Sequence, residues 1–160
     1  MDMLVRLYDL PDITPVMKKM DEQGIKIERA FPPNRLHIID WVKKHSGIYG
    51  AGEAECCFGK KAPTLFIASR DNKILGYACY NATAPDYFGP TRVLDEEQGK
   101  GIGKALLLKC MYALREEGYG YAIIGYVGPV EFYEKCLGAV KIENSSPGLY
   151  HKMLRIKNED

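Results

Sequence analysis

The residues with the clearest chemical meaning lie near the middle of the chain, where Gly99, Gly101 and Gly103 occupy alternate positions. They remove the Cβ atoms at the point where an apolar, helix-like pattern begins. The first amides of a helix have no intrahelical acceptor, and the helix dipole favours negative charge beside them. Lys100 and Lys104 add positive charge to the same segment. These residues predict an anion site in which backbone N–H groups converge on phosphate oxygens.

The spacing of this turn argues against two well-known phosphate-binding loops. A P-loop has the pattern GxxxxGK[ST], but Ala105 follows Gly103-Lys104, and Gln98 stands where the first glycine should be. A dinucleotide loop, GxGxxG, needs its last glycine one residue after Gly103. ATP or NAD binding is therefore disfavoured. A merely flexible strand-to-helix turn is the structural alternative, and the clustered glycines and lysines favour the anion site over it.

The remaining pattern, Gln98-x-x-Gly101-x-Gly103, resembles the [RQ]-x-x-G-x-[GA] signature of the GNAT superfamily of N-acetyltransferases, and the following KALLLK is also typical. The resemblance is strong over residues 89–139. Elsewhere it is limited to the expected order of strands and helices. It implies acetyl-CoA (coenzyme A) as co-substrate, with the pyrophosphate held by backbone amides and no metal. The coenzyme-binding residues that it implies in the turn are Gln98, Gly99, Lys100, Gly101, Ile102, Gly103, Lys104 and Ala105.

The same resemblance implies a path for the pantetheine arm of the coenzyme. In the family this arm runs along the strand before the turn like an added strand, which maps to Thr91, Val93 and Leu94. A bulge in that strand leaves one amide free to polarise the thioester carbonyl, which is an oxyanion-hole role.

Tyr133, in the segment EFYEKCLGA, is the candidate catalytic residue. Helical spacing groups it with Val130, Cys136 and Leu137, so a core tyrosine with a satisfied hydroxyl is the structural alternative. The segment also resembles the family's FYEK, whose tyrosine lies near the coenzyme sulfur. A phenol of pKa about 10 can reprotonate a thiolate whose thiol has a pKa of about 8.5. We therefore favour a proton-donor role.

The sequence departs from the family pattern at three positions. Tyr126 and Pro129 stand where Asn and Ala are often found, and Asp95 replaces a common proline. The departures at Tyr126 and Pro129, together with the absence of an obvious general base, support the alternative hypothesis of a non-catalytic acyl-CoA-binding module or sensor. The leading hypothesis is an enzyme: direct attack of an amine on acetyl-CoA in a ternary complex.

The sequence leaves the general base and the acceptor amine open. Candidate bases follow or flank the central strands, but Glu96 and Glu97 are interpreted first as a solvated charge run, and the histidines have no stronger claim. Aromatic residues of the loop before the turn could line an acceptor pocket or belong to the core. The residues considered as bases are Tyr80, Asp86, Tyr87, Glu96, Glu97, His37, His45 and His151. The aromatic residues considered for the pocket are Tyr80, Tyr87 and Phe88.

One domain, residues 1–160, is expected, because no repeat or low-complexity linker divides the chain. The predicted fold class is α/β (α+β): a mixed, mostly antiparallel sheet of about seven strands with helices on both faces. Strands are expected at 3–8 (an edge strand), 54–58, 64–69, 74–81, 90–94, 121–127 and 149–156. Helices are expected from Asp12 to Gly24, from Asn34 to His45, from the glycine turn to Gly118, and from 129 to Gly138.

Composition limits the partners. The formal net charge is +1, from 22 basic and 21 acidic residues, which does not suggest nucleic-acid binding. The five cysteines lack CxxC spacing and suggest buried reduced thiols rather than a disulfide framework, a zinc site or a thiol nucleophile. No signal peptide or long apolar run is seen, so a cytoplasmic protein without membrane contact is expected. A small-molecule or peptide amine is the expected partner, and a homodimer is compatible with the sequence.

Overall fold

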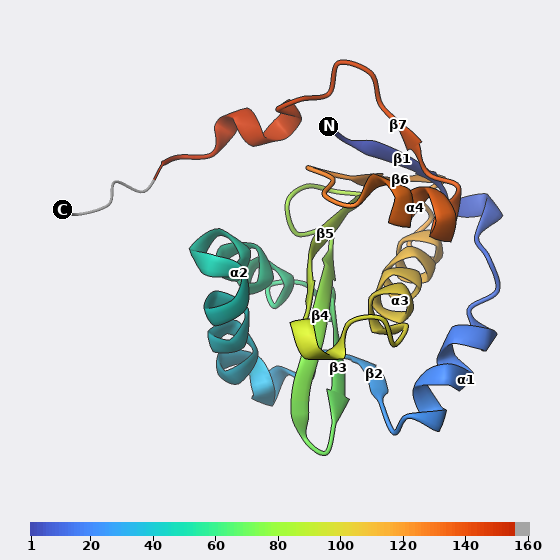
Figure 1. Cartoon of the computed structure of the whole chain (residues 1–160). Helices are drawn as coiled ribbons and strands as arrows, with labels where there is room; N and C mark the ends of the chain where they lie inside the picture. The colour runs from blue at the N-terminus through green and yellow to red at the C-terminus, as the bar shows by residue number, and fades with distance from the viewer. Residues whose placement is uncertain (156–160) are drawn as a thin grey trace.

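A seven-stranded sheet with the order β2-β3-β4-β5-β6-β1-β7 forms the centre of the molecule (Figure 1). The computed structural model describes residues 1–155. All neighbouring strands are antiparallel except β5 and β6, which are parallel. This confirms the predicted mixed, mostly antiparallel sheet. The strands are β1 (Met3–Arg6), β2 (Lys26–Arg29), β3 (Leu65–Arg70), β4 (Lys73–Tyr80), β5 (Tyr87–Val93), β6 (Tyr121–Ile124) and β7 (Val140–Lys141).

Helices cover both faces of the sheet, as expected. Apolar residues of α1 (Thr14–Glu22), α3 (Ile102–Glu116) and α4 (Val130–Leu137) belong to one buried cluster, on the face where Figure 1 shows α1 and α3. The opposite face is covered by α2 (Arg35–Cys57), whose buried residues pack in a second cluster with β4. Burial of these apolar side chains is the main force that holds the layers together.

Strands β5 and β6 separate soon after they meet. They pair only at Tyr87 with Ile123 and at Phe88 with Ile124, whereas β5 continues to Val93. In Figure 1, β3, β4 and β5 run together through the middle of the molecule, and β6, β1 and β7 lie together at its top. The later part of β5 therefore has a strand partner on the β4 side only. This opening links the two faces of the sheet and positions the site described below.

Helix α2 corrects the predicted strand at 54–58. The helix is interrupted at Gly47 (φ 77°, ψ −175°), where the sequence predicted an end, and then resumes to Cys57. Ala51, Ala54 and Cys57 recur every three residues and are all buried, which is a helical period. The strand prediction was wrong because a short apolar run shows the same composition in either state.

The edges of the sheet also differ from the prediction. Strand β1 lies between β6 and β7 and is not an edge strand. The true edges, β2 and β7, were missed, since strands of four and two residues offer almost no period to recognise. The predicted strand at 149–156 is wrong for residues 149–155, which form no strand: 148–152 form a 3-10 helix, η4 (Gly148–Lys152). Residue 156 lies outside the described residues.

Several predicted boundaries are confirmed. The hairpin between β3 and β4 turns at Asp71 and Asn72, both with positive φ. Gly118 and Gly138 follow α3 and α4 in left-handed conformation. No helix within the described residues has a stretch long and apolar enough to cross a membrane.

Candidate active site

A cavity of about 660 Å³ lies at the N-terminal end of α3, between the glycine turn and α4. Eight of the eleven residues expected to bind coenzyme line it, while Leu94, Lys100 and Ala105 do not. The eight are Thr91, Val93, Gln98, Gly99, Gly101, Ile102, Gly103 and Lys104. Sequence reasoning missed other lining residues, among them Arg92, Leu107 and Phe132. Arg92 adds a cation, partly neutralised by an ion pair with Asp95 at 3.5 Å.

Backbone conformation explains why the turn needs glycine. Gly99 and Gly101 have φ values of 79° and 93°, which residues other than glycine rarely adopt. Within the described residues, the Gln98 amide donates to the Asp95 carbonyl and the Ala105 amide to the Gly101 carbonyl. No acceptor is recorded there for the amides from 99 to 104. The available anion site is thus two residues shorter than the sequence suggested, because its first and last amides are used locally.

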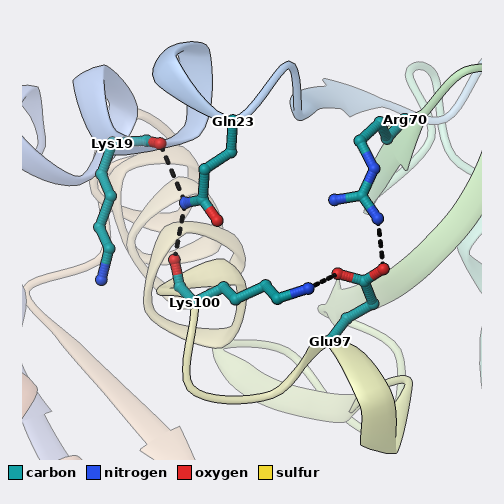
Figure 2. A network of polar contacts seen from close by, with 5 residues as sticks. All are labelled: Lys19, Gln23, Arg70, Glu97 and Lys100. Carbon is teal, nitrogen blue, oxygen red and sulfur yellow. Dashed lines mark hydrogen bonds and ion pairs between the residues drawn. The ribbon is translucent and has the colours of Figure 1, made fainter.

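A polar network anchors the turn to two neighbouring elements (Figure 2). The Gln23 side chain, after α1, donates to the backbone carbonyls of Lys19 and Lys100, each at 3.0 Å. The Lys100 ammonium binds the Glu97 carboxylate at 2.6 Å, and Arg70 binds its other oxygen. Lys100 therefore neutralises a carboxylate of η3 (Asp95–Glu97) and is not among the residues that line the cavity.

This network overturns the interpretation of Glu97 as a solvated charge. Glu97 is only 7% exposed, whereas Glu96 is exposed. Bonds from Lys100 and then Arg70 lower the pKa of the Glu97 carboxyl. An uncompensated carboxylate here would repel a phosphate at the helix terminus, so the two cations keep the cavity suitable for an anion.

Replacing Glu97 by Gln is expected to lower the melting temperature at pH 7, because the ion pairs are lost. A carboxyl group whose pKa is lowered in the folded state stabilises the protein above its ordinary pKa, here 4.5, and this contribution disappears as the pH falls. The difference between wild type and Glu97→Gln should therefore shrink as the pH falls below 4.5, and vanish only below the lowered pKa of the Glu97 carboxyl. Thermal melts of both proteins from about pH 3 to pH 8 check this, and a gap that does not change with pH would contradict it.

The open edge of β5 supplies further donors. The Leu94 amide donates to the Leu75 carbonyl of β4 at 2.9 Å. Peptide groups of a strand alternate between its two sides, and the β4 register is regular from Val93 to Thr91. The amides of Thr91 and Val93 therefore point away from β4, toward the opening beside β6. Leu94, which was expected to take part, has its amide already paired.

Tyr133 joins this cavity to a second one. Its side chain is 6% exposed and lines both the 660 Å³ cavity and a neighbouring cavity of about 290 Å³. Phe88, Thr91 and Pro129 are shared by the two cavities as well. Among the described residues, no protein group is recorded as a hydrogen-bond partner of the Tyr133 hydroxyl. Burial, with a smaller contribution from Cys136, raises the pKa of Tyr133 to about 12, so the hydroxyl stays protonated at neutral pH.

Glu53, on α2, is a candidate site residue that the sequence did not identify. It lines the 290 Å³ cavity from the opposite face of the sheet, and a third cavity of about 330 Å³ adjoins it on the α2 side. Thr83 donates a hydrogen bond to its Oε2. Burial raises the pKa of the Glu53 carboxyl. A helical interpretation of 48–56 would have grouped it on one face with the other α2 residues of that cavity, which are Ile48, Tyr49, Gly52 and Cys56.

The other candidate residues lie elsewhere or serve structure. Tyr80 accepts a hydrogen bond from Arg29 at 2.6 Å, and Asp86 and Tyr87 line none of the three cavities. The histidines at 37, 45 and 151 are also absent from their walls. Cys79 and Cys110 are fully buried, and burial raises the pKa of both thiols, which agrees with core thiols rather than nucleophiles.

Comparisons with solved structures agree with this architecture. A GCN5-related glucosamine N-acetyltransferase region of a fungal multi-domain GH3 β-N-acetylglucosaminidase superposes with a TM-score of 0.68 at 14% identity; the match covers 85% of this chain and 19% of that one. A GCN5-related N-acetyltransferase from Sphaerobacter thermophilus gives a TM-score of 0.59 at 16% identity, covering 87% and 47%. This chain thus spans less than half of either protein, and the likeness concerns the fold.

The sequence itself identifies the family more directly. No curated protein matches the chain significantly. The family model described as the acetyltransferase (GNAT) family, however, matches residues 25–139, which include Tyr133, where the two cavities meet, and Glu53 on α2. This protein therefore belongs to the acetyltransferase (GNAT) family.

Proposed function

We propose that this protein transfers an acetyl group from acetyl-CoA to a primary amine, with both substrates bound at once. The observation that carries the proposal is the meeting of two cavities at Tyr133. The larger cavity has the amides and cations that a pyrophosphate requires, and the smaller one reaches Glu53 on the other face of the sheet. Two substrates entering from opposite faces would meet at this junction.

In the proposed reaction, residues of the chain bind and orient rather than form covalent bonds. Acetyl-CoA supplies the acetyl group as an activated thioester. Backbone amides from 99 to 104 would hold its phosphates, and the Thr91 or Val93 amide would donate to the carbonyl oxygen. The amine nitrogen forms a C–N bond as the C–S bond breaks. Of the two protons that a protonated amine gives up, one ends on the sulfur and the other is released to solvent.

Tyr133 would act on the departing sulfur. Its pKa of about 12 lies well above that of an ordinary thiol, about 8.5, so full proton transfer to the thiolate is unfavourable. A buried, protonated hydroxyl is nevertheless a strong hydrogen-bond donor to developing negative charge. The proposed role is therefore hydrogen-bond donation that stabilises the leaving thiolate, which is narrower than the reprotonation expected from the sequence.

The proposal is tested by incubating the full chain with acetyl-CoA and a panel of primary amines. Mass spectrometry should detect acetylated amine, and a thiol reagent should detect an equal amount of free CoA. Isothermal titration of CoA measures the donor site separately. CoA binding without any acetylated product would overturn the enzymatic proposal in favour of a binding module, and absence of CoA binding would overturn both.

A further inference from the structure

The two smaller cavities also carry information about the acceptor. We call the cavity of about 290 Å³ that reaches Tyr133 the inner cavity, and the one of about 330 Å³ on the α2 side the outer cavity. Glu53 and Tyr150 line both of them, and Thr83 lines the outer one. Their volumes, about 290 and 330 Å³, are at the small end of the range for ligand sites, about 300–1,000 Å³. A compact molecule, or the end of an extended one, fits such a space.

The charged side chain that lines these two cavities is negative. Glu53 is the only charged side chain among the residues that line either cavity in the described part of the chain. Its Oε2 accepts from Thr83, while no donor to its Oε1 is recorded among those residues. A second carboxylate, Asp2, lies behind the wall, where its Oδ1 accepts the Tyr126 amide at 3.1 Å. The site therefore offers a cation an unpaired carboxylate oxygen, and it offers an anion no cationic side chain from the described residues.

Aromatic and apolar groups make up much of the remaining wall. Phe88, Tyr126, Tyr133 and Tyr150 surround the inner cavity, and the Tyr126 and Tyr150 rings lie 5.3 Å apart. Faces of such rings attract ammonium groups and also bury apolar carbon. The outer cavity continues with apolar residues of α2 and with Met153.

The segment η4 completes this wall by close packing. A Cβ atom at Gly125 would lie 2.6 Å from the Tyr150 hydroxyl oxygen, so the absence of a side chain there lets Tyr150 approach β6. Burial raises the pKa of the Tyr150 hydroxyl, and the charges of Glu53 and Asp2 raise it further. Tyr150 thus stays protonated, and the negative charge of the pocket is not increased by its ionisation.

We infer that the acceptor is a small primary amine with an apolar or aromatic body and no carboxylate beside the amine, and that Glu53 binds its ammonium group. The inference rests on the proposed function and specifies its acceptor. A carboxylate next to the amine would come close to Glu53 in a partly buried site without a compensating cation. Juxtaposed like charges are strongly unfavourable in such settings, so free amino acids are excluded.

Matched acceptor pairs test this inference. Benzylamine, phenethylamine and hexylamine are compared with phenylglycine, phenylalanine and 2-aminoheptanoic acid, which carry an added carboxylate on the same body. For the wild type, kcat/KM is expected to be at least about 100-fold higher for the amine of a pair. Glu53→Gln should lower kcat/KM for the amines about 30-fold, mainly through KM, and leave the amino acids nearly unchanged.

Glu55→Gln is the matched control, because Glu55 lies on the same helix, pairs with Arg35 and lines neither cavity. It should behave as wild type. Glu53→Gln should fold normally, since it removes a buried charge and keeps an acceptor for Thr83. Three outcomes would overturn the inference while leaving the proposed function intact. They are equal use of amines and amino acids, an equal loss of kcat/KM for both in Glu53→Gln, and acetylation of peptide lysine alone. CoA binding with no acetylated product from any acceptor would instead overturn the proposed function.

Discussion

Gly103→Glu is expected to weaken CoA binding by at least about 100-fold, or about 2.7 kcal/mol, while the protein stays folded. Gly103 has no positive φ, and a Cβ there would make ordinary contacts with Phe132 and Val93, at 3.8 and 3.9 Å. Both neighbours line the 660 Å³ cavity, so the new side chain projects into it. An acidic residue in the first turn favours the helix itself but repels a phosphate at the same place.

Isothermal titration of CoA and a thermal melt of Gly103→Glu check this result. Gly120→Glu is the control, because Gly120 is exposed, lies beyond the other end of α3, and would have no neighbouring atom within 4 Å of an added Cβ. Gly101 is less suitable, since its φ is 93° and a Cβ would lie 3.3 Å from Lys19 and Met20. Unchanged affinity in Gly103→Glu would mean that the coenzyme lies elsewhere.

Tyr133→Phe is expected to lower kcat about 100-fold and to change CoA affinity by less than about threefold. The substitution removes only the hydroxyl and keeps the ring that packs against Phe88 and Phe132. No hydrogen bond to the described part of the chain is recorded for that hydroxyl, so folding should lose little. Stabilisation of the leaving thiolate is needed only in the transition state, which is why the loss should appear in kcat.

Steady-state kinetics and CoA titration separate the two effects. Cys136→Ala is a useful companion variant, because Cys136 adds to the raised pKa of Tyr133 but lines neither cavity. It should keep wild-type kcat. A Tyr133→Phe protein with unchanged kcat would show that Tyr133 is only a core residue, which is the structural alternative for this side chain.

Most of the fold was predictable because its signals are local. Glycines that end α3 and α4, the Asp71-Asn72 turn and the apolar strands β3 and β4 each show their state within a few residues. The misassigned segments lack such signals. Residues 54–57 continue a helix past Gly47, and β2 and β7 are strands only because β3 and β1 offer them an edge.

The candidate site also has one part that the sequence predicted and another that it did not. The glycine turn was recognisable because its residue types and spacing lie within one short segment. Two details were not. The Lys100 side chain forms an ion pair with Glu97, and the amides of Leu94 and Ala105 are already hydrogen-bonded, to the Leu75 carbonyl of β4 and to the Gly101 carbonyl. Glu53 was missed because its role depends on the separation of β5 from β6, which brings α2 and α4 to one cavity. That separation is a tertiary feature without a local signal.

Initial rates measured while acetyl-CoA and an amine are both varied test the central claim most directly. If the two substrates meet at Tyr133 in one ternary complex, double-reciprocal plots should intersect to the left of the vertical axis. The intact mass of the protein should also stay unchanged when acetyl-CoA is added without amine. Parallel lines together with an acetylated protein would contradict the account, because they would require a covalent enzyme intermediate.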